Sequence, residues 1–94
     1  MVEIKWTHNA LEDLEDIGNY ISKDSPKYAQ ILITQIYEIV NSLKQFPMFG
    51  RKVPEYNDPK LREIIYKNYR IIYLVKNIQL EIISVIHGSR KLRV

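Results

Sequence analysis

The spacing of hydrophobic residues changes along the chain, and it begins with the two-residue period of a strand. Apolar and polar side chains alternate in residues 2–6, which predicts a half-buried β-strand. Leucine and isoleucine then recur every three or four positions up to Ile21, which predicts an amphipathic helix. Thr7 is placed to cap the start of this helix, and we expect the helix to end between Ser22 and Asp24.

A second and stronger helical pattern begins at Ser25 and Pro26. Serine is a favourable N-cap, and proline is tolerated at the first helical position because no N–H donor is needed there. Apolar residues follow at spacings of three and four as far as Leu43. Pro47 is expected to end the helix, because it disfavours helical geometry at Phe46.

The segment from Pro47 to Pro59 interrupts the regular patterns. It contains three prolines, Gly50 and the polar pair Asn57–Asp58, so we predict an irregular loop. At about a dozen residues this loop is long for a compact domain, and ordered loops of such length often carry function.

Three runs rich in β-branched and aromatic residues follow, and each predicts a strand. The runs are residues 61–66, 69–75 and 80–86, separated by the polar pairs Lys67–Asn68 and Lys76–Asn77. Turns this short force neighbouring strands to run antiparallel. Because two helices with one apolar stripe each can cover one face of such a meander, we expect one two-layer α+β domain over residues 1–94, in the order β-α-α-β-β-β.

The last two predicted strands are apolar at both alternating sets of positions. A two-layer domain covers only one face of its sheet, so apolar residues on the second face need a protein partner or the chain's own tail. This mismatch predicts that the sheet contacts another protein.

Composition and charge narrow the class of protein. The chain has no cysteine, no signal-peptide pattern and no apolar run near the roughly 20 residues of a membrane span, so we expect a cytoplasmic protein without membrane contact. Residues 1–50 contain four Lys/Arg and seven Asp/Glu, a net charge of −3, whereas residues 51–94 contain ten against four, +6. The basic half predicts an anionic or acidic partner.

Basic groups scattered along the strand region are expected to gather on the folded meander. The candidate binding residues are Arg51, Arg62, Arg70, Tyr73, His87 and Arg90. Arg70 lies on a central strand, where it either binds a partner or forms an internal salt bridge with Glu63. Arg51 either contacts a target or clamps its loop near Glu55, and Tyr73 packs in the core or against a partner.

Several short motifs occur in an order and spacing that cover nearly the whole chain. They are Trp6 with Ala10 and Leu14, residues 17–21, Ser25–Pro26 with Ala29, Leu43, Pro47, Gly50–Arg51, Pro54–Glu55, Arg62, residues 69–73 and residues 87–90. In this order the motifs resemble the RelE/ParE superfamily of toxins from type II toxin–antitoxin pairs, and the ParE-like branch, the plasmid-stabilisation proteins, most closely. The resemblance implies the same topology and a growth-arresting toxin neutralised by a co-expressed antitoxin.

The resemblance implies one of two activities. ParE-like members block DNA gyrase through a protein contact, whereas RelE-like members cut messenger RNA on the ribosome. RNA cleavage needs a base, an acid and cations against the phosphate. By resemblance Arg70 and Arg90 match phosphate-binding arginines and His87 could transfer a proton, but Ile64 cannot titrate and no tyrosine stands near the C-terminus. We therefore predict a ParE-like gyrase inhibitor.

Two alternatives remain open. One is a ribosome-dependent mRNA endoribonuclease that uses Arg70, Arg90 and His87 as its catalytic residues. The other is an inert member that binds only its antitoxin or, as a corepressor, operator DNA. We expect no cofactor and no metal, and contact with operator DNA only through the antitoxin complex.

Overall fold

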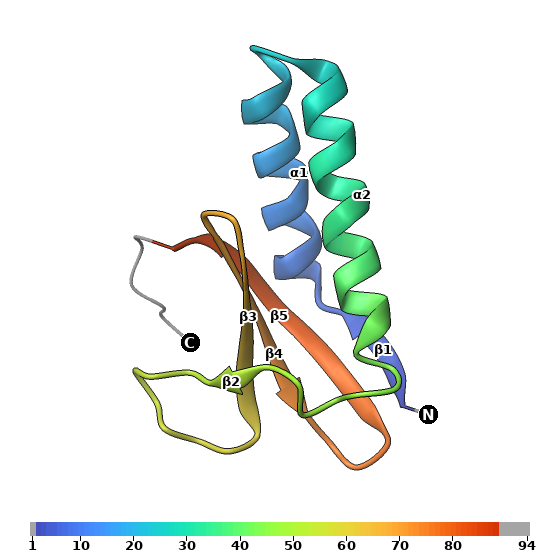
Figure 1. Cartoon of the computed structure of the whole chain (residues 1–94), viewed down its shortest axis with the longest axis vertical. Helices are drawn as coiled ribbons and strands as arrows, with labels where there is room; N and C mark the ends of the chain where they lie inside the picture. The colour runs from blue at the N-terminus through green and yellow to red at the C-terminus, as the bar shows by residue number, and fades with distance from the viewer. Residues whose placement is uncertain (1, 89–94) are drawn as a thin grey trace.

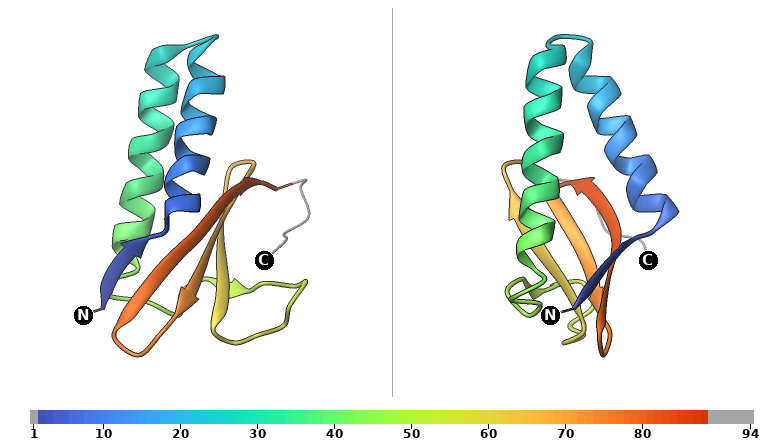
Figure 2. Two further views of the ribbon diagram at one scale, coloured as in Figure 1. Left: turned by 180° about the vertical axis from the view of Figure 1, so that it is seen from behind. Right: turned by 90° about the vertical axis from the view of Figure 1, so that its right-hand side faces the viewer.

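The computed structural model describes residues 2–88, and in it a helical hairpin stands on one face of a five-stranded sheet (Figures 1 and 2). The elements are β1 (Glu3–Trp6), α1 (His8–Ser22), α2 (Pro26–Ser42), β2 (Arg51–Lys52), β3 (Leu61–Tyr66), β4 (Tyr69–Val75) and β5 (Gln79–His87). The order of strands across the sheet is β1-β5-β4-β3-β2. The predicted α+β class and helix–helix–meander order are confirmed.

The sheet is mixed, because one of its strands joins from the far end of the chain. The strands β2, β3, β4 and β5 are antiparallel to their neighbours, whereas β1 runs parallel to β5, from Glu3 opposite Gln79 to Trp6 opposite Ile82. The helical hairpin is the long connection between β1 and the meander. The antiparallel meander is as predicted, and the structure adds the parallel pairing of β1 with β5, which the sequence prediction left open.

Both helices begin at the predicted caps. The Thr7 hydroxyl accepts a hydrogen bond from the Ala10 N–H at 3.1 Å, and the Ser25 hydroxyl accepts one from the Tyr28 N–H at 3.1 Å. The end of α2 comes earlier than predicted, at Ser42 rather than next to Pro47. After Ser42 the chain continues in tight turns, in which the N–H groups of Leu43, Lys44 and Gln45 donate to carbonyls three residues earlier.

The prediction that Pro47–Pro59 contains no regular structure is wrong at one point. Arg51 and Lys52 pair with β3 as a two-residue edge strand. Two residues are too few to show a period, so this strand left no pattern in the sequence.

The main core lies between the hairpin and the sheet. Its fully buried residues include Leu32 and Ile36 from α2 and Ile71 and Tyr73 from β4. Burying each large aliphatic side chain contributes about 1.5–3 kcal/mol. The far end of the hairpin extends beyond the strands in all views, so only the near part of each helix covers the sheet (Figures 1 and 2).

A smaller core on the opposite face of the sheet covers some of the apolar residues for which a partner or the chain's own tail was predicted. Val53, Leu61 and Ile72 are buried there, and Leu74, Ile83 and Ile86 are partly buried against them. Because Val53 follows β2 directly, the loop itself supplies some of the cover. The chain's tail, the other cover considered above, lies outside the described residues.

Candidate functional site

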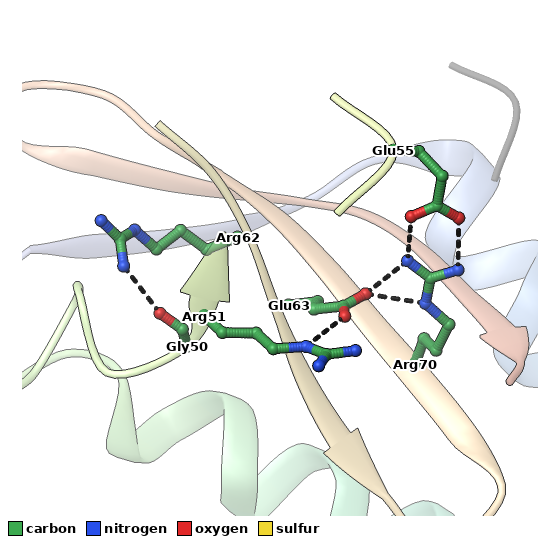
Figure 3. A network of polar contacts seen from close by, with 6 residues as sticks. All are labelled: Gly50, Arg51, Glu55, Arg62, Glu63 and Arg70. Atoms are coloured by element: carbon green, nitrogen blue, oxygen red, sulfur yellow. Dashed lines mark hydrogen bonds and ion pairs between the residues drawn. The ribbon is translucent and has the colours of Figure 1, made fainter. Parts of the chain in front are cut away.

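A buried carboxylate on the second face of the sheet organises the polar residues around it. The side chain of Glu63 in β3 is 0% exposed, and Arg51 of β2 lies directly opposite it in the strand register. Its Oε2 accepts a hydrogen bond from Arg51 Nε at 2.7 Å, and its Oε1 accepts one from Arg70 Nε at 2.7 Å (Figure 3). A buried charge is costly unless it is paired, and here the carboxylate has a cation at each oxygen.

Arg70 lies between two carboxylates. Its Nη1 and Nη2 each donate to one oxygen of Glu55 at 2.8 Å, which is the two-pronged geometry of the strongest arginine–carboxylate pairs (Figure 3). The residue is only 7% exposed, and all three guanidinium nitrogens donate to Glu55 or Glu63. The hydrogen bonds from Arg70 to Glu55, and then to Glu63, raise the pKa of Arg70 above its ordinary value, although burial opposes them.

We call Arg51, Glu55, Glu63 and Arg70 the Arg70 network. Of the two alternatives for Arg70, the structure shows the internal salt bridge with Glu63. It also shows Glu55 on Arg70, whereas the sequence placed Glu55 beside Arg51. No periodic signal marks Glu55, because it follows an edge strand in a turn and its partner is determined by the fold.

Beside the network lies a hollow of about 480 Å³, lined by Arg51, Pro54, Glu55, Ile65, Arg70 and Gly88. Its polar groups are members of the network. Glu55 could accept a proton there by residue type alone, but both of its carboxylate oxygens accept hydrogen bonds from Arg70.

Arg62 and Tyr73 fasten the loop before β2. Arg62 Nη1 donates to the Gly50 carbonyl at 2.9 Å, and its Nε donates to the Pro59 carbonyl at 2.8 Å. The Tyr73 hydroxyl accepts a hydrogen bond from the Gly50 N–H at 2.8 Å, and Tyr73 is fully buried. In this fold both candidate residues therefore hold the chain together around Gly50.

His87 ends β5 beside a second hollow, of about 430 Å³, between α1 and the sheet. The imidazole lies edge-on to the Tyr69 ring with centroids 5.9 Å apart. On the helix side Asp13 accepts hydrogen bonds from the Ser84 hydroxyl at 2.8 Å and the Val85 N–H at 2.9 Å. Burial, together with the nearby hydroxyls of Tyr28 and Tyr20, raises the pKa of Tyr69.

The basic side chains were expected to gather in one place, but the alternation of side chains along the strands sends them to different faces of the sheet. Arg62 pairs with Tyr73 and His87 pairs with Tyr69, which puts both on the helix side of the sheet. Arg70 points to the opposite face with Glu63. Arg90 lies outside the described residues.

Within residues 2–88, no group of three His, Asp or Glu side chains could hold a metal ion, and neither helix is long and apolar enough to cross a membrane. What the described site offers is therefore a neutralised ion-pair network and two hollows beside the sheet.

Comparison with known proteins decides the family. The family model described as "ParE toxin of type II toxin-antitoxin system, parDE" matches residues 4–92. The chain belongs to the ParE toxin family.

Relatives of this ParE toxin agree with the assignment. It is 32% identical over 91 residues to Toxin RelE2 of Caulobacter vibrioides, covering 96% of this chain and 99% of that protein. A solved chain of the chromosomal ParDE toxin–antitoxin system from P. aeruginosa matches with a TM-score of 0.77 and 26% identity, over 93% of this chain and 96% of that one. The YoeB dimer structure from Staphylococcus aureus shares the fold, with a TM-score of 0.61, 20% identity and coverage of 88% and 92%.

The protein is thus the toxin of a type II toxin–antitoxin pair in the RelE/ParE superfamily, and a cognate antitoxin is its partner.

Proposed function

We propose that this ParE toxin arrests growth by binding DNA gyrase, and that it does not cut RNA. The observation that carries the proposal is the engagement of Arg70: it is 7% exposed, and every guanidinium nitrogen donates to a carboxylate of the same chain. Because the contacts with Glu55 and Glu63 engage up to four of its five N–H groups, Arg70 has no pair of donors with which to clamp a phosphate unless Glu55 is displaced.

The other candidate residues do not supply the catalytic groups that RNA cleavage would need. Cleavage of RNA needs a base, an acid and a cation around one phosphate. His87 lies on the helix side of the sheet and Arg70 points to the other face, so the two side chains do not form one cluster of acid, base and cation. Inhibition by protein contact needs no such set, only a complementary surface.

The cognate antitoxin neutralises the toxin by covering the exposed surface of the hairpin and sheet. The partly buried Leu74, Ile83 and Ile86 on the second face offer an apolar surface to a segment that folds on binding. The hollow by His87 offers it a mixed surface, because apolar side chains there alternate with Asp13 and Asp16. The toxin acts in the cytoplasm, where gyrase is found, and reaches operator DNA only within the antitoxin complex.

A direct test adds purified toxin to a gyrase supercoiling reaction. We expect supercoiling to stop and to recover when antitoxin is added, while relaxation by a type I topoisomerase continues. The same preparation should leave messenger RNA intact in translating ribosomes. Full supercoiling at a large molar excess of toxin, with cut messenger RNA in the ribosome assay, would refute the proposal in favour of the endoribonuclease.

A further inference from the structure

The connection between α2 and β2 displays three large apolar side chains to solvent. Phe46 is 65% exposed, Met48 48% and Phe49 75%. The connection lies at the end of the sheet remote from the tip of the helical hairpin (Figures 1 and 2). Single exposed apolar residues are ordinary, but three within four positions mark an interaction site. We call Phe46–Phe49 the apolar knob.

The knob is fixed at both of its ends. On one side Leu43 is fully buried in the main core. On the other side Gly50 donates its N–H to the Tyr73 hydroxyl at 2.8 Å, and its carbonyl accepts from Arg62 at 2.9 Å. Between them the Phe49 N–H donates to the Phe46 carbonyl at 3.0 Å and closes a turn. Such a preorganised turn loses little conformational entropy when it binds.

Cations flank the knob on both sides. Lys44 precedes it, and Arg51 and Lys52 follow it, with no acidic residue between positions 44 and 54. Arg51 keeps 62% of its side chain exposed although its Nε is paired with Glu63. The complementary surface therefore has an apolar centre and an acidic rim.

Two features favour a folded protein as the partner. Exposures of 65% and 75% mean that the phenyl rings project from the surface, so they fit a concave pocket better than an unfolded segment. Three cations are few for nucleic acid, whose binding rests mainly on phosphate neutralisation. Projecting aromatic anchors inside a polar rim are the usual pattern of a protein interface hot spot.

We infer that the apolar knob is the anchor with which the toxin engages its target protein, inserted into an apolar pocket rimmed by carboxylates, and that the antitoxin binds elsewhere. This inference rests on the proposed action through a protein contact. It deepens that proposal by assigning the contact to particular residues.

The test compares the double variant Phe46→Ser/Phe49→Ser with Ile78→Ser. Ile78 is 74% exposed in the turn between β4 and β5, so it matches the loss of an exposed apolar side chain that is not part of the knob. We expect the double variant to bind gyrase about 30-fold more weakly and to arrest growth no longer, as for loss of an interface hot spot. Both variants should keep the wild-type melting temperature and antitoxin affinity.

Three results would overturn the inference. They are unchanged growth arrest by the double variant, an equal loss with Ile78→Ser, and a parallel loss of antitoxin affinity. If wild-type toxin leaves gyrase active but the double variant still abolishes arrest at equal protein levels, the gyrase proposal fails while the knob stands as the anchor for another target.

Lys44→Glu/Lys52→Glu tests the acidic rim, because it should weaken target binding at least tenfold at low salt, and unchanged binding would exclude the rim.

Discussion

Each charge in the Arg70 network has its counter-charge within the same chain. Two arginines face two glutamates, and the fully buried Glu63 joins both arginines. A buried pair adds little net stability, yet removing one partner leaves an uncompensated charge in a low dielectric. The network therefore explains how Glu63 and Arg70 are accommodated at buried positions of these mostly apolar strands.

Glu63→Gln tests the network at this scale. The substitution keeps the size of the side chain but leaves two arginines beside a neutral amide. We expect the free energy of unfolding in urea to fall by about 3 kcal/mol. Glu38→Gln, on the exposed surface of α2, is the matched control and should change it by less than about 0.5 kcal/mol. Equal effects of the two variants would mean that the network has no structural role.

Tyr73 predicts a dependence of stability on pH. Burial raises its pKa above the ordinary 10.0, although the hydrogen bond with Gly50 and the charge of Arg62 oppose this. Above pH 10 the unfolded chain has released the phenol proton and the folded chain still holds it, so the free energy of unfolding falls as pH rises. Tyr69, whose pKa is also raised, adds to the same trend.

The variant Tyr73→Phe separates the pH dependence caused by the Tyr73 hydroxyl from that of the other titrating groups. At pH 7 it should lower the free energy of unfolding by about 1–2 kcal/mol, because the buried Gly50 N–H loses its acceptor. Above pH 10 the gap to wild type should narrow, since the variant has no proton to release there. Denaturant unfolding from pH 7 to 11 measures the free energy of unfolding of both proteins. A difference between them that widens with pH would contradict the raised pKa of Tyr73.

At the scale of elements, local signals were sufficient for the helices and insufficient for the edges of the sheet. Thr7 and Ser25 lie at caps that the sequence marks directly. In contrast, the alternation over residues 2–6 predicted β1 as a strand but not its pairing with β5, more than 70 positions away. The two residues of β2 are too few to show any spacing. The end of α2 at Ser42 was not marked in the sequence, because the fully buried Leu43 continues the apolar spacing of the helix.

Gly50 determines whether β2 can lie against the sheet. A Cβ at this position would lie 2.6 Å from the Glu63 carbonyl oxygen and 2.7 Å from the Tyr73 hydroxyl. The Glu63 oxygen belongs to the backbone and cannot move aside. We expect Gly50→Ala to destabilise the protein by about 1–3 kcal/mol and to speed hydrogen exchange at Val53, whose N–H donates to Leu61.

The matched control is the glycine in α1. A Cβ at Gly18 would meet only Ile33 side-chain atoms, the nearest at 3.7 Å, which is ordinary contact. Gly18→Ala should therefore stabilise the protein by about 0.5–1 kcal/mol through its higher helix propensity. Destabilisation by Gly18→Ala as large as by Gly50→Ala would show that the contacts at Gly50 are not the cause.

At the scale of the whole molecule, charge is divided between the two halves of the chain: −3 over residues 1–50 and +6 over residues 51–94. The sequence revealed this division but not where the cations point. Strand alternation sends Arg62 and His87 to one face and Arg70 to the other, and Glu55 reaches Arg70 only through the folded loop. The sequence therefore predicted an acidic partner and raised the Arg70–Glu63 pair as one alternative. The contacts of Arg51 with Glu63 and of Glu55 with Arg70 could be seen only in three dimensions.

The mode of growth arrest tests the gyrase proposal most directly in living cells. Within minutes of expressing the toxin without its antitoxin, a DNA-damage reporter and the rate of protein synthesis are measured together. If the toxin blocks gyrase, damage signalling rises while protein synthesis continues and messenger RNA stays whole. An immediate collapse of protein synthesis with cut messenger RNA and a silent damage reporter would contradict the proposal.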